Sequence, residues 1–224
     1  MTRKRRLLRG SYNNIMEIFQ NSSVETKIAG EDWYYDANTV ACNIGALISK
    51  TADINKPHYK TESLVGAGVL SAFSPQTSWD RNITIANIFA MDLFQPKGTT
   101  ATTYNKATKI VEKYIRGDYE ENPITENDIL DILGQESYKT KPFFMNILHP
   151  EGDYGVTIDR HALGVYLRQR PTTLQLSRVA GRIGNTQVQN SYKQASKLLG
   201  VHHNIVQATT WVEWRNNWSD YVKV

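Results

Sequence analysis

The stretch "GVTIDRHALGVYLRQ", residues 155–169, runs from a short β-prone segment into the start of an amphipathic helix. Asp159, Arg160 and His161 stand consecutively at that junction. An aspartate at a helix start accepts hydrogen bonds from free backbone N–H groups and suits the positive end of the helix dipole. A capping role alone would explain Asp159, so the segments around it decide between a structural and a chemical role.

Helical periodicity extends in both directions from this stretch. The segments with apolar residues at helical spacing are 12–20, 32–49, 62–73, 77–94, 102–118, 125–134, 139–150, 159–169, 187–199 and 204–218. The third of them, "ESLVGAGVLSAF", is so rich in small and apolar residues that we expect burial on all sides, with Gly66 and Gly68 allowing close backbone contacts. The chain has no long strand pattern and no internal repeat, so it is predicted to be an all-α bundle of about ten helices.

Length and composition favour one compact domain, which we place over residues 12–224 of the 224-residue chain. No apolar run approaches the roughly 18 residues that span a bilayer, so we expect no membrane association. The start, "MTRKRRLLRG", is strongly basic, and residues 1–11 are predicted to form a flexible basic arm. This arm and the net charge of +4 suit either a polyanion partner or a tail that aids solubility.

The sequence lacks the residues that several kinds of chemistry require. Cys42 is the only cysteine, which excludes an internal disulfide and an iron–sulfur cluster held by four thiolates of one chain. The sequence has no HExxH or CxxC motif for a metal and no glycine-rich phosphate loop. We therefore expect no metal and no cofactor, and the cysteine content favours a reducing, cytoplasmic compartment.

Three motifs occur in order between residues 62 and 170. The first, "VLSAFSPQTSWDRNITIANIF" at 69–89, carries Gln76 after a helix rich in small residues. The second, "ILGQESYKTK" at 132–141, is a tight turn between two short helices and leads into Lys139. The third, "TIDRHAL" at 157–163, holds Asp159 twenty positions beyond that lysine. Their order and separations resemble those of the helix–hairpin–helix DNA glycosylase superfamily, whose members are all-α enzymes of about this length.

The resemblance implies an enzyme that flips a base out of double-stranded DNA into a pocket lined by residues 69–89 and 155–169. Asp159 would be the catalytic carboxylate, which stabilises positive charge at the sugar as the glycosidic bond breaks. Lys139 would be the candidate nucleophile for a Schiff base, and Gln76 would help to wedge the duplex open. The other residues expected to contact substrate or DNA are Trp79, Arg81, Asn82, Tyr138, Thr140, Arg160 and His161.

The chain departs from the superfamily at the hairpin. The proline and the second glycine of the family motif are missing, and Glu136 brings a negative charge to the turn. If Lys139 lies one position off the family lysine, it is a phosphate contact and the enzyme is monofunctional. Trp79 is either a core aromatic or a base-stacking wedge, and the tryptophans of "QATTWVEWRNNW", 207–218, have the spacing of packing residues.

Two other functions stay open at this point. The superfamily includes phage-encoded members implicated in hypermodified pyrimidines, and the compact length and degenerate hairpin are compatible with a phage protein in the host cytoplasm. A non-catalytic helical protein that binds DNA, or acts as an inhibitor, would keep the scaffold and use the basic arm. The sequence is silent on the oligomeric state.

Overall fold

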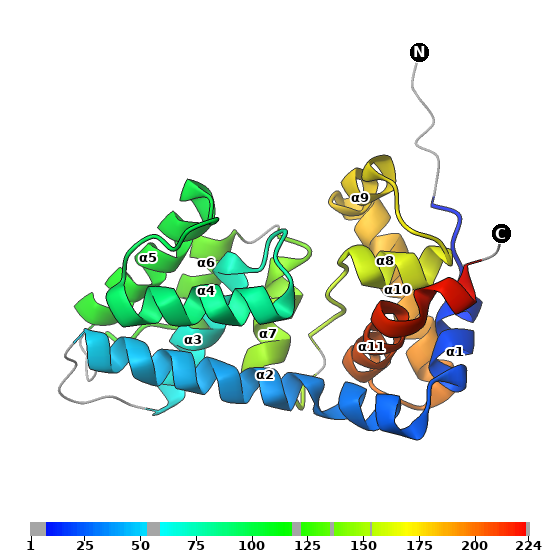
Figure 1. The fold of residues 1–224 in the computed structure, drawn as a ribbon, viewed down its shortest axis with the longest axis horizontal. Coiled ribbons are helices and arrows are strands. Elements are labelled where there is room, and N and C mark those ends of the chain that lie inside the picture. The colour runs from blue at the N-terminus through cyan, green and yellow to red at the C-terminus, as the bar shows by residue number, and fades with distance from the viewer. Residues whose placement is uncertain (1–7, 53–58, 118–121, 135–136, 153, 223–224) are drawn as a thin grey trace, which may run out of the picture. The chain divides into compact units, whose positions relative to one another are not determined.

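The computed structural model describes residues 8–52, 59–117, 122–134, 137–152 and 154–222, and this part of the chain is all-α without a strand (Figure 1). Its helices are α1 (Tyr12–Asn21), α2 (Val24–Thr51), α3 (Tyr59–Phe73), α4 (Trp79–Asp92), α5 (Ala101–Arg116), α6 (Glu126–Leu133), α7 (Thr140–Leu148), α8 (Arg160–Leu167), α9 (Thr173–Val179), α10 (Arg182–Leu199) and α11 (His203–Tyr221). The predicted fold class is confirmed. None of the described helices is both long and apolar enough to cross a membrane.

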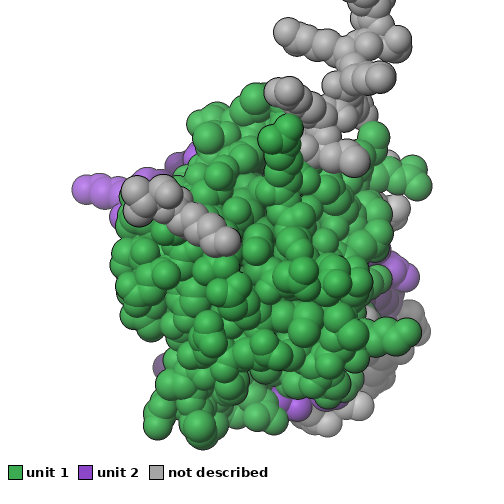
Figure 2. All heavy atoms as spheres, turned by 90° about the vertical axis from the view of Figure 1, so that its right-hand side faces the viewer, with its two compact units in different colours: residues 1–33, 153–224 green, residues 34–152 purple. Residues whose placement is uncertain are grey.

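The chain divides into two compact units, which Figure 2 shows in two colours. Unit 1 comprises residues 1–33 and 153–224, and unit 2 comprises residues 34–152. The helix α2 contributes residues to both units. The single domain expected over residues 12–224 stays a prediction.

Unit 2 is built around α3. Residues 64–74 are all buried, and α3 packs against α4, α5, α6 and α7, as expected from its small and apolar residues. A Cβ on Gly66 would lie 1.8 Å from the carbonyl oxygen of Ala41 on α2. This glycine therefore lets the backbones of α2 and α3 touch, which no larger residue permits.

Unit 1 has its own core, which α1, α8, α10 and α11 supply together. Leu8 belongs to this core, with 5% of its surface exposed, and both its backbone N–H and its carbonyl bond to the Gln187 side chain. These bonds join Leu8 to α10. The flexible arm expected over residues 1–11 stays a prediction. Residues 1–7, the rest of that arm, lie outside the described residues.

Two helix boundaries differ from the sequence prediction by five residues or more, and one helix was not predicted. Helix α2 begins at Val24, eight residues before the predicted start at 32, and its first turns pack at Gly30 against Thr209 of α11. Helix α9 was not predicted, although Thr172 and Gln175 form a capping box at its start. Helix α10 begins at Arg182 rather than 187. In each case the segment is short of apolar residues at helical spacing, so the periodic signal is weak.

Candidate active site

The segment that leads to Asp159 is fixed to the core of unit 1. Val156, Thr157 and Ile158 are buried, and the side-chain amide of Gln189 on α10 bonds to both the N–H and the carbonyl of Val156. An extended segment whose backbone groups are paired in this way has little freedom to move. The position of the residue that follows it, Asp159, is therefore well defined.

Asp159 is the N-cap of α8, and its two carboxylate oxygens have different partners. Oδ1 accepts a hydrogen bond of 2.8 Å from the backbone N–H of Ala162. Oδ2 accepts one of 3.1 Å from the indole Nε1–H of Trp211 on α11. The side chain is half-buried. A carboxylate has about four lone-pair positions, so positions on both oxygens stay open for a further donor.

Trp211 is surrounded by aromatic and basic side chains of the same unit. Its ring lies edge-on to His161, with centroids 5.6 Å apart, and to Trp33, with centroids 5.8 Å apart. The guanidinium of Arg215 lies 5.1 Å from its centroid. The indole that contacts Asp159 thus has aromatic rings and a cation beside it, and such a cluster suits a planar, electron-rich ligand.

A second polar group contacts the first turn of α8, which Asp159 caps. The hydroxyl of Tyr192 on α10 donates a hydrogen bond of 3.1 Å to the carbonyl of Ala162 and is fully buried. Burial raises the pKa of Tyr192, and the negative charge of Asp159 raises it further. Tyr192 therefore stays neutral and serves as a fixed donor that orients the first turn of α8.

The predicted hairpin forms from α6 and α7 in unit 2. Gly134 ends α6 with a φ of 98°, and Lys106 of α5 donates a hydrogen bond of 2.6 Å to the carbonyl of Leu133 at that end. Lys139 is the N-cap of α7, half-buried, and its carbonyl accepts from the N–H of Phe143. Glu136, where the sequence departs from the family, lies outside the described residues.

A family model described as a family of unknown function (DUF7178) matches residues 2–218, nearly the whole chain. The chain belongs to the DUF7178 family. No curated protein and no solved structure matches it. The resemblance of this DUF7178 protein to the glycosylase superfamily stays a prediction from the sequence.

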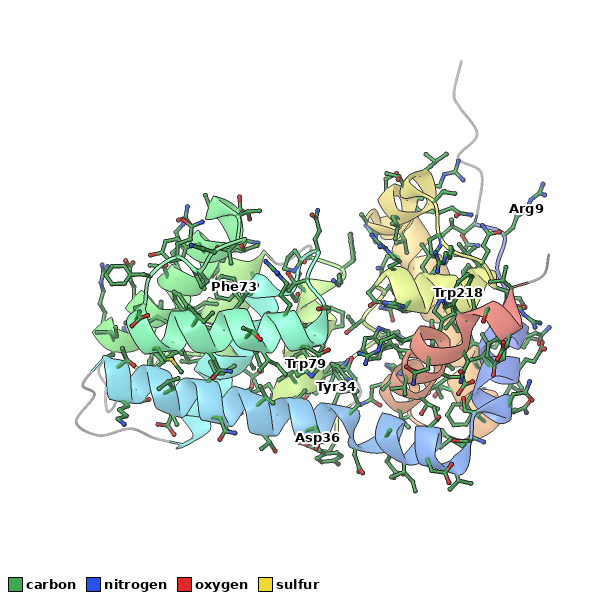
Figure 3. All side chains as sticks on the ribbon, viewed as in Figure 1. Arg9, Tyr34, Asp36, Phe73, Trp79 and Trp218 are labelled. Carbon is green, nitrogen blue, oxygen red and sulfur yellow. The ribbon has the colours of Figure 1, made fainter. Side chains whose placement is uncertain are left out.

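The turn between α3 and α4 of this DUF7178 protein and the first residue of α4 hold two of the predicted residues. Gln76 is exposed and adopts a φ of 61°, an uncommon left-handed conformation for a residue with a Cβ. Trp79, labelled in Figure 3, is the first residue of α4 and is half-buried. Its ring lies edge-on to that of Phe143 on α7, with centroids 6.2 Å apart. Its contact with α7 supports the core interpretation for this tryptophan.

Asn82 is a correction to the predicted DNA contacts. It is only 1% exposed, and its side-chain amide donates a hydrogen bond of 3.0 Å to the carbonyl of Leu70 on α3. Its role is to join α4 to α3, because a buried side chain has no access to a ligand on the surface. Arg81, one position earlier, is exposed and lies against Gly98.

The predicted site residues fall into two groups. Asp159, Arg160 and His161 lie in unit 1, where Arg160 is exposed and His161 contacts Trp211. The residues of unit 2 are Gln76, Trp79, Arg81, Asn82, Tyr138, Lys139 and Thr140. Among these, Tyr138 is half-buried and Thr140 is buried. Within the described residues, no group of three or more His, Cys, Asp or Glu side chains could hold a metal ion.

Trp211 is the residue that sequence analysis missed. Its spacing with Trp214 and Trp218 indicated packing, and Trp214 is indeed buried. The hydrogen bond from Trp211 to Asp159 joins positions 52 residues apart in sequence, and no local sequence pattern predicts such a contact. The one general signal that could have found Trp211 is the preference of a buried indole N–H for a hydrogen-bond acceptor.

Proposed function

We propose that this protein is a DNA N-glycosylase-like enzyme that acts in the cytoplasm, with Asp159 as its catalytic carboxylate. The observation that carries the proposal is the half-exposed carboxylate held by Ala162 and Trp211, at the position that the motif "TIDRHAL" predicted. Two N–H donors fix its orientation before any substrate arrives, and a preorganised charge is what a developing oxocarbenium ion requires.

The reaction would proceed at one sugar carbon. The bond from C1′ to the base nitrogen breaks, and the base leaves with the electron pair. A water oxygen forms the new bond to C1′, and its proton passes to the carboxylate of Asp159. That proton then passes to the nitrogen of the departing base, which restores the carboxylate. The products are a free base and an abasic site. Arg160, exposed beside the acid, is suited to a phosphate contact, and the rings of Trp211 and His161 are suited to the base.

The experiment compares wild type with Asp159→Asn on duplex oligonucleotides that carry a range of modified and mismatched bases. Base release is measured by mass spectrometry under single turnover, with alkaline cleavage at the abasic site as a second readout. We expect release by the wild type from at least one substrate and a loss of roughly 100-fold or more in the variant. Asp220→Asn, which removes an exposed acid of the same unit, is the matched control and should retain activity.

Two results would overturn this proposal: no release of any base by the wild type, or equal rates in wild type and Asp159→Asn. A gain of mass on the DNA base, in place of its loss, would assign the site to base modification. Lys139 is tested separately by borohydride trapping, in which a covalent adduct lost in Lys139→Ala indicates a Schiff base. Without an adduct the enzyme is monofunctional.

A non-catalytic DNA-binding protein is the second candidate, and one observation favours it. Both carboxylate oxygens of Asp159 already hold structural hydrogen bonds, one to its own helix and one to α11. A residue needed only for the fold would show this same pattern. Under that hypothesis wild type and Asp159→Asn bind duplex DNA equally, and neither releases a base.

A further inference from the structure

The positive charge of the chain is concentrated in one region of unit 1. Residues 160–212 contain seven Lys and Arg residues and no Asp or Glu. The rest of the chain holds 19 basic and 22 acidic residues, a net charge of −3, although the whole chain carries +4. The acid-free region covers α8, α9, α10 and the first half of α11.

Within this region, α10 presents its basic residues on one side. At 100° per residue, Arg182, Lys193 and Lys197 lie within roughly 60° of one another around the helix axis. All three are exposed. The residues that α10 buries are Asn185, Val188, Tyr192 and Ala195. Their mean direction lies roughly 130° from that of the three cations around the helix axis. The solvent-facing side of α10, orange in Figure 1, is therefore a basic face made of Arg182, Lys193 and Lys197.

No acidic group offsets these charges in the described residues. The ion pairs found there involve Lys113, Arg116, His149 and Arg168, and none involves the basic face of α10. Arg170 is engaged elsewhere, 3.7 Å above the ring of Trp218. Between the three cations, the exposed residues of α10 include Thr186 and Asn190, which are neutral hydrogen-bonding side chains.

We propose that the basic face of α10 binds the phosphate backbone of duplex DNA. From Arg182 to Lys197 the helix rises about 22 Å, a distance along which duplex DNA presents more than ten phosphate charges. Cations with neutral polar residues between them suit a regular polyanion, because they contact phosphates without reading bases. A membrane surface fits less well, since a helix that lies on a membrane needs a broad apolar face, and the large apolar side chains that α10 exposes are Ile183 and Leu198, at its two ends.

This contact would hold the protein on DNA at any sequence, which is what an enzyme needs while it searches for a rare base. The inference rests on the proposed function only for the choice of DNA among polyanions. The charge distribution and the geometry of α10 do not depend on the proposed function.

The test compares wild type with the triple variant Arg182→Gln, Lys193→Gln, Lys197→Gln. Binding of a short unmodified duplex is measured by fluorescence anisotropy over a series of salt concentrations. The control variant replaces Lys50, Lys97 and Lys109 by Gln, which removes three exposed lysines of unit 2 and changes the net charge equally. Unfolding curves of all three proteins check the fold, since such surface changes usually alter stability by less than about 0.5 kcal/mol.

Each phosphate contact contributes about 0.9 to the slope of log K against log salt, so the triple variant should show a slope less steep by about 2.7. At 0.1 M salt its affinity should fall by between about tenfold and 500-fold. The control should resemble the wild type. An unchanged slope in the triple variant would overturn the proposal, as would an equal loss in both variants. Binding of phosphatidylserine vesicles in place of the duplex would also overturn it.

The outcomes separate this inference from the proposed function. If the triple variant loses duplex binding while no base is ever released, the basic face holds and the glycosylase proposal fails. If base release occurs and the triple variant binds DNA as the wild type does, the glycosylase proposal holds and the proposal for the basic face fails.

Discussion

The hydrogen bonds of Asp159 make a specific prediction about the pair of substitutions Asp159→Asn and Trp211→Phe. Both the Ala162 N–H and the Trp211 indole N–H are donors, so both oxygens of residue 159 must accept. An asparagine has one oxygen and one NH₂ group. In either orientation of the amide, its NH₂ group faces one of these two N–H groups. A carboxylate satisfies both donors, and an amide satisfies one.

The size of the effect follows from those contacts. Asparagine caps a helix as well as aspartate does, so the cost of Asp159→Asn comes from the unsatisfied contact, about 2 kcal/mol of unfolding free energy. With Trp211→Phe in place, one donor is gone, and the asparagine can turn its oxygen to Ala162 and its NH₂ group to solvent. The two substitutions together should therefore cost about 1–2 kcal/mol less than the sum of the single costs.

Urea unfolding of the four proteins measures this coupling. Four of the five tryptophans, Trp33, Trp211, Trp214 and Trp218, lie in unit 1, so tryptophan fluorescence reports chiefly on the unit that contains the site. Since stabilities of domains are about 5–15 kcal/mol, Asp159→Asn should remain folded, and its loss of base release can be assigned to the lost charge. Costs that add to within about 0.5 kcal/mol would refute the two-donor arrangement.

Three further predictions concern packing, the hairpin and pH. Gly66→Ala should destabilise unit 2 by about 3 kcal/mol or more in urea unfolding, because the new Cβ would lie 1.8 Å from the Ala41 carbonyl oxygen. Lys106→Met should cost about 1 kcal/mol, since it removes the 2.6 Å hydrogen bond to Leu133 at the end of α6, and wild-type stability in this variant would contradict the bond. Burial, followed by a neighbouring carboxylate, raises the pKa of Tyr221 from 10.0 to about 12. The folded state favours the neutral phenol. The contribution of Tyr221 to the unfolding free energy is therefore present below pH 10 and is lost as the pH rises to 12. Unfolding free energy should fall by up to roughly 2.7 kcal/mol more over this range in the wild type than in Tyr221→Phe, and parallel curves would contradict the shift.

The sequence alone determined the features that depend on neighbours along the chain. Apolar residues at helical spacing located most of the helices, and the small residues of 62–73 predicted a helix buried on all sides. The capping preference of aspartate placed Asp159 at the start of α8, where the structure has it. The glycine at 134 marked the turn between α6 and α7. These signals are local, because helix propensity and capping act within one or two turns.

The tertiary structure decided what surrounds those local elements. It brought Trp211 from α11 to the carboxylate of Asp159, turned Asn82 inward to α3, and joined Leu8 to the core of unit 1. It also showed that the uncapped start of α10 and the short α9 are helical, although apolar periodicity is weak in both segments. Such contacts join residues far apart in the chain. They form because the burial of apolar surface stabilises the complete packed arrangement, which no short stretch of sequence predicts.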